Sequence, residues 1–62
     1  MSFSRAWLEA TIYDLFDELH IPEEDHEHLF DRTMRAVATG KVSPTNDRRD
    51  MRRQLRRYLS HA

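Results

Sequence analysis

The sequence predicts an all-α fold, either a small three-helix bundle or a helical hairpin followed by a third helix. Apolar residues recur at the three- and four-residue spacing of a helix face, and no segment alternates as a strand does. Two prolines and one glycine are the only strong breakers, and Pro22 and Gly40 separate segments of helix length. The predicted helices of this single helical domain, residues 1–62, lie at about 4–20, 22–39 and 45–60.

The first predicted helix carries two apolar stripes, and Ser2 or Ser4 is a suitable N-cap. The stripe that predicts a core face is Leu8, Ile12, Leu15, Phe16 and Leu19. The stripe nearly opposite is Phe3, Ala6, Trp7, Ala10 and Tyr13. A helix that packs on one side needs only one stripe. The second stripe therefore either closes over the third helix or forms an intermolecular contact.

The second predicted helix has clear signals at both ends. Pro22 suits the first helical position, and Glu23, Glu24 and Asp25 would then lie at the positive end of the helix dipole. Gly40 can adopt the left-handed conformation that ends helices. The predicted apolar face is Leu29, Phe30, Thr33, Met34 and Val37.

The third predicted helix has a narrow apolar seam and a wide basic surface. Ser43 before Pro44, or Thr45 followed by Asp47, signals its start. The seam is Met51, Leu55, Tyr58 and Leu59. Six arginines fall within ten residues as three adjacent pairs, Arg48/Arg49, Arg52/Arg53 and Arg56/Arg57, which stack along the helix because residues four apart lie one above another.

Charge is distributed very unevenly along the chain. Residues 1–31 hold nine carboxylates and one basic residue, whereas residues 32–62 hold nine basic residues and two carboxylates. The arginine pairs can be satisfied internally by the acidic helices, or they can dock an external acidic partner. A guanidinium forms forked contacts with either carboxylate or phosphate, so protein and nucleic acid are both candidate partners. We expect an acidic protein surface first, because the acidic half of the chain would repel phosphate.

The predicted partner-binding residues combine the basic helix with the aromatic stripe of the first helix. Trp, Tyr, Phe and Arg are the residue types enriched where binding energy concentrates in interfaces. The predicted set is Arg49, Arg52, Arg53, Arg56, Arg57, Phe3, Trp7 and Tyr13.

A cluster of histidines and acids around the connection between the first and second predicted helices is the only sequence pattern that indicates a metal site. It contains an acid three residues before a histidine three times, at Asp17/His20, Glu23/His26 and Asp25/His28. These pairs crowd one turn, their histidines point to different sides, and the chain has no cysteine. A solvated first turn with His26 partly facing the core is the simpler interpretation, so we expect no metal and no cofactor.

Size limits the remaining function classes. A chain of 62 residues buries too little surface for a stable core to be assured, which favours a homodimer. It has no nucleophile–base motif or phosphate loop, and it is too short to enclose a substrate pocket, so we expect no enzyme. No leader or long apolar run is visible, which predicts a soluble cytoplasmic protein without membrane contact. The expected function is a small interaction module that docks an acidic partner through the arginine-rich third helix and the aromatic stripe. A nucleic-acid-binding regulator that uses the same helix is the alternative, and a helical metal-binding protein is a distant third.

Overall fold

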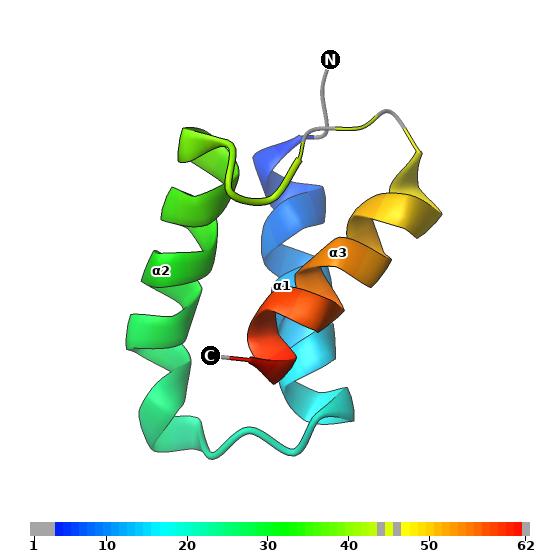
Figure 1. Cartoon of the computed structure of the whole chain (residues 1–62). Helices are drawn as coiled ribbons and strands as arrows, with labels where there is room; N and C mark the ends of the chain where they lie inside the picture. Colours follow the sequence, from blue (N-terminus) through cyan, green and yellow to red (C-terminus); the bar gives the residue numbers. More distant parts are fainter. Residues whose placement is uncertain (1–3, 44, 46, 62) are drawn as a thin grey trace.

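The computed structural model describes residues 4–43, 45 and 47–61. Within these residues the chain is all-α, as predicted, with three α-helices, one short 3₁₀ turn and no strand. The elements are α1 (Arg5–Glu18), η1 (Glu23–Asp25), α2 (His26–Thr39) and α3 (Arg48–Ser60). Helices α1 and α2 lie side by side as an antiparallel hairpin, and α3 crosses α1 obliquely (Figure 1).

Helix α1 begins where the sequence indicates and ends slightly earlier. The Ser4 side chain caps it by accepting a hydrogen bond from the Trp7 N–H at 3.1 Å. The helix ends at Glu18 instead of His20, because His20 takes a left-handed conformation with φ of 57°. Its N–H bonds the Asp17 carbonyl and the next N–H bonds the Phe16 carbonyl, so the turn satisfies carbonyls that the helix end leaves open.

Helix α2 starts later than predicted and ends as predicted. Pro22 is extended, with φ of −58° and ψ of 143°, and the three acidic residues after it form η1 before the α-helix begins at His26. Gly40 ends the helix with φ of 84°. The N–H groups of Gly40 and Lys41 bond the carbonyls of Val37 and Ala36, at 3.3 and 2.9 Å.

Asp47 sets the start of α3. Its carboxylate accepts hydrogen bonds from the N–H groups of Arg49 and Asp50, at 2.9 and 3.4 Å. The helix therefore begins at Arg48, later than the predicted start near residue 45. In the alternative start signal, Ser43 before Pro44, the proline lies outside the described residues.

The core lies where α1, α2 and α3 meet, and it uses the predicted faces of α1 and α3. Thr33 is fully buried on α2, and its hydroxyl donates to the Leu29 carbonyl at 2.7 Å. Phe30, Met34 and Val37 are only partly buried at the edge of the core. The buried apolar residues are Leu8, Ile12, Leu15, Phe16, Leu29, Ala36, Val42, Met51, Leu55 and Leu59.

Candidate functional site

The structure divides each arginine pair between two roles. Adjacent helical residues lie about 100° apart around the axis, so the two members of a pair face different surroundings. The first members, Arg48, Arg52 and Arg56, all contact α1. The second members, Arg49, Arg53 and Arg57, are exposed.

Two of the first members hold carboxylates of α1. Arg52 lies 2.8 Å from a carboxylate oxygen of Asp14 and donates to Glu18 at 2.9 Å. Arg56 donates through Nε to the other oxygen of Glu18 at 2.7 Å. One arginine thus bridges two acids and one acid accepts from two arginines. This network is the internal pairing that the sequence left open, and it connects α3 to α1.

The same network shifts the proton affinities of its members. The hydrogen bond from Arg56 is the largest influence on Glu18, and together with Arg52 it lowers the pKa of the carboxyl against the opposing effect of desolvation. The hydrogen bond to Asp14 is the main cause that raises the pKa of Arg52. Both shifts mean that the charged forms of these groups are favoured when α3 sits on α1.

This network predicts an acid-sensitive contribution of Glu18 to stability. Its folded-state pKa lies below the ordinary value of 4.5, so the contribution is present above pH 4.5 and is lost as pH falls through the folded-state pKa. Glu18→Gln should therefore destabilise the chain near neutral pH, and its difference from wild type should shrink in acid. Chemical denaturation across the pH range measures this, with the exposed Glu24→Gln as control. A difference that stays constant with pH would contradict the assignment.

The first pair also reaches α1, through an aromatic contact. The Arg48 guanidinium lies over the Trp7 ring, 5.7 Å from its centroid, in the arrangement of a cation–π contact. Trp7 is half-buried and packs against the core. Tyr13, by contrast, turns towards α2, stacks on Phe30 with centroids 5.3 Å apart and remains 49% exposed.

The predicted aromatic stripe is therefore divided between both neighbours of α1. Trp7 faces α3 and Tyr13 faces α2, so neither has its whole ring in solvent. Phe3 lies outside the described residues. The role of these three residues in binding a partner stays a prediction.

The second members of the arginine pairs differ in what surrounds them. Arg53 pairs with Asp50, whose carboxylate also accepts from Gln54 at 3.1 Å. The hydrogen bond from Arg53 is the main cause that lowers the pKa of Asp50. Arg49 and Arg57 have no ion pair with any residue that the structure describes. No described carboxylate therefore occupies these two guanidinium groups.

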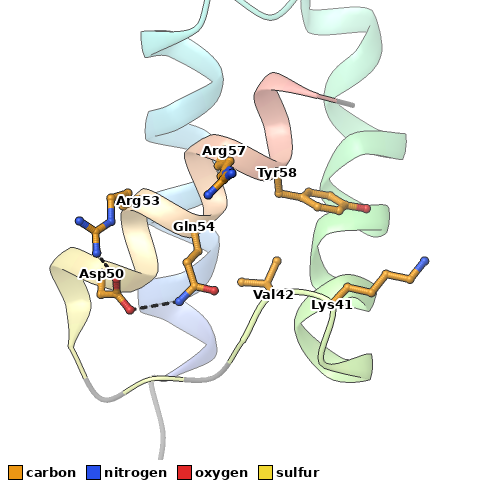
Figure 2. A pocket seen from close by; sticks show the side chains of 7 residues that line it. All are labelled: Lys41, Val42, Asp50, Arg53, Gln54, Arg57 and Tyr58. Atoms are coloured by element: carbon orange, nitrogen blue, oxygen red, sulfur yellow. Dashed lines mark hydrogen bonds and ion pairs between the residues drawn. The ribbon is translucent and has the colours of Figure 1, made fainter.

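Arg53 and Arg57 line a depression of about 610 Å³ beside the connection from α2 to α3 (Figure 2). Figure 2 shows Val42 and Lys41 projecting from that connection, with the Tyr58 ring extending from α3 towards α2. Val42 is buried and Tyr58 is partly buried, so the depression combines an apolar part with cations. The lining residues are Lys41, Val42, Asp50, Arg53, Gln54, Arg57 and Tyr58.

A second depression, of about 290 Å³, continues from the first towards α2. The two share Lys41 and Tyr58. The second adds Arg32 and Arg35, which lie on α2. Sequence reasoning missed Lys41, Arg32 and Arg35 as site residues. Their only signal was the positive charge of the second half of the chain, and no spacing rule connects α2 to α3.

The three histidines around the connection from α1 to α2 lie in different surroundings and do not converge on one point. His20 occupies the left-handed position after α1. His26 partly faces the core, as predicted: it stacks on Phe16 with centroids 4.5 Å apart, and its Nε2 lies 2.9 Å from the Ile21 carbonyl. His28 is exposed on α2. In the described part of the chain, no three His, Asp or Glu residues gather in a way that could hold a metal ion.

We therefore predict that a chelator does not change folding. Addition of EDTA should leave the melting temperature of the purified chain unchanged, because a metal that binds the folded state would raise that temperature by mass action. Circular dichroism with and without EDTA measures it. A fall of more than a few degrees would contradict the prediction and point back to Asp17, His20, Glu23, His26 and His28.

Comparisons with known proteins supply no family for this chain: no protein-family model, curated protein or solved structure matches it. Among the residues described, no helix has the length and apolarity needed to cross a membrane.

Proposed function

We propose that this chain is a small non-enzymatic interaction module that docks an acidic macromolecular partner, as an adaptor, a regulator or an inhibitor. The observation that carries the proposal is the exposed row of second members, Arg49, Arg53 and Arg57, left over after the first members have paired with α1. Forked guanidinium contacts give such a row both affinity and orientation towards carboxylates. Carboxylates of α1 hold the guanidinium groups of Arg52 and Arg56. A contact of these two arginines with the partner therefore remains a prediction.

A protein partner is favoured over nucleic acid by the charge around the arginine row. Asp50 lies within it and pairs with Arg53, and α1 contributes Asp14 and Glu18 beside the neighbouring arginines. Nucleic acid carries a phosphate at every nucleotide, so each of these carboxylates would oppose it. An acidic protein can place its charges selectively and adds apolar contacts.

Affinity capture from the native host, followed by mass spectrometry, tests the proposal. Wild type should retain an acidic protein that Arg49→Glu/Arg53→Glu/Arg57→Glu loses, while the variant stays folded by circular dichroism. A gel shift with duplex and single-stranded DNA and RNA at two salt concentrations tests the alternative. Binding to nucleic acid that falls by about 0.9 log units per phosphate contact for each log unit of salt would replace the protein partner with nucleic acid.

The proposal includes self-association through the outer side of α1. Ala6 and Ala10 are exposed there beside the half-exposed Tyr13, and small residues allow a second helix to approach closely. A chain this small buries little apolar surface on its own, and dimerisation would add to the area that is buried. Sedimentation equilibrium at micromolar concentration should give a dimer, and Tyr13→Glu should shift it towards monomer. A wild-type mass near 7.5 kDa at every concentration would contradict it.

A further inference from the structure

The two depressions adjoin, since Lys41 and Tyr58 line both, and we name them together the α2–α3 track. Lys41 and Tyr58 belong to both depressions and therefore lie at its middle. Arg53 and Arg57 lie at the α3 end, and Arg32 and Arg35 lie at the α2 end. The track thus carries cations at both ends, with an aromatic ring and a lysine between them.

The cations of the track are only partly neutralised by the chain itself. Arg53 pairs with Asp50, and Arg35 lies 3.4 Å from an oxygen of Asp31. Arg32, Lys41 and Arg57 have no ion pair with any described residue. Each section of the track therefore keeps one cation free for an external anion.

The middle of the track is suited to an apolar side chain. The Tyr58 ring packs against the core and is partly buried, so its position is fixed by its neighbours. Val42 is 3% exposed and lies between Tyr58 and Gln54 in the depression (Figure 2). An apolar group placed here would cover the part of the Tyr58 ring that still faces water, and this burial would stabilise binding.

We propose that the α2–α3 track binds a short acidic segment of a partner protein, with carboxylates at both ends and an apolar side chain against Tyr58. The inference rests on the proposed function, since it specifies where the acidic partner binds and which sequence pattern the bound segment has. The carboxylates contact Arg57 at one end and Arg32 at the other. Lys41 lies between these two arginines and attracts the carboxylates on either side of the apolar side chain.

Several features of the track favour carboxylates over a phosphate backbone. Asp50 lines the first depression, and Asp31 pairs with Arg35 of the second. A strand that is charged at every nucleotide would meet both carboxylates, whereas a peptide can place its own carboxylates away from them. The N-terminus of α3, which would otherwise suit a phosphate, is already occupied by the Asp47 carboxylate.

NMR titration of the isotope-labelled full chain tests this proposal. The probes are the blocked peptides Glu-Glu-Phe-Glu-Glu and Gln-Gln-Phe-Gln-Gln, and a short oligothymidylate, each at physiological salt. The acidic peptide should shift the amide signals of Lys41, Val42, Arg57 and Tyr58 in a saturable way. The glutamine peptide should bind at least about tenfold more weakly, because it lacks the ion pairs.

Two matched variants locate the site. Arg57→Glu and Arg49→Glu change the same charge on the same helix, and neither arginine has an ion pair among the described residues. Arg57→Glu should weaken the acidic peptide by about fivefold or more, and Arg49→Glu should have a much smaller effect. Melting temperatures of both variants check that the fold is intact.

The remaining outcomes overturn the inference in distinguishable ways. If Arg49→Glu abolishes binding and Arg57→Glu does not, the proposed function stands. The binding site is then the exposed surface around Arg49, outside the track. If oligothymidylate shifts the track amides and the acidic peptide does not, the ligand is nucleic acid, and both proposals fall. If no probe shifts these amides, the track is not a binding site, and capture from the host decides the function separately.

Discussion

Replacing Phe16 with alanine is expected to lower the free energy of unfolding by about 3–5 kcal/mol. Phe16 is 1% exposed, stacks on His26 and meets the Tyr13 ring edge-on at 5.4 Å. Its loss removes buried apolar area and leaves a cavity between α1 and the start of α2. A chain of 62 residues typically has a total stability of about 3–9 kcal/mol, so this loss removes a third or more of it and would unfold the variant at the lower end of that range.

Urea denaturation followed by circular dichroism measures this loss, with Tyr13→Ala as the control. Tyr13 is on the same helix and touches Phe16, but half of its surface already faces water. Its replacement should therefore cost much less than that of Phe16. A Phe16→Ala variant within about 1 kcal/mol of wild type would contradict the packing of α1 described above.

Charge reversal at two first members of the arginine pairs, on the side of α3 that faces α1, is expected to have the second large effect on stability. Arg52→Glu/Arg56→Glu removes three close ion pairs and places two carboxylates against Asp14 and Glu18. Like charges repel at that separation, so α3 should loosen from α1 and the melting temperature should fall clearly. Thermal unfolding by circular dichroism measures it.

Arg49→Glu/Arg57→Glu is the matched control, since it changes the net charge equally on the outer side of the same helix. Neither arginine has an ion pair within the described residues, so its melting temperature should stay close to that of wild type. High salt should narrow the gap between the two variants. Equal melting temperatures at low salt would show that the network with α1 does not hold α3.

Much of the fold follows from local sequence signals. Apolar periodicity identified the faces of α1 and α3, and Gly40 marked the end of α2, because these features depend on neighbouring residues alone. The early end of α1 was not predictable in the same way. A histidine at position 20 gives only a weak indication of the left-handed conformation, which glycine normally supplies.

The candidate site is harder to predict because it depends on how the helices dock. The sequence shows that the members of each arginine pair diverge around α3, but it does not show which member meets Asp14 and Glu18. The α2–α3 track joins Arg32 to Arg57 across two helices and a connection. Such a contact arises only from tertiary packing, and no sequence period records it.

We propose that α3 uses Arg52 and Arg56 to hold the fold and Arg49, Arg53 and Arg57 to bind carboxylates of a partner. Retention of the folded chain on immobilised polyglutamate at physiological salt separates the two roles. Wild type should be retained and released by salt, and Arg49→Glu/Arg53→Glu/Arg57→Glu should pass through while keeping its melting temperature. Retention of that variant equal to wild type would contradict the claim.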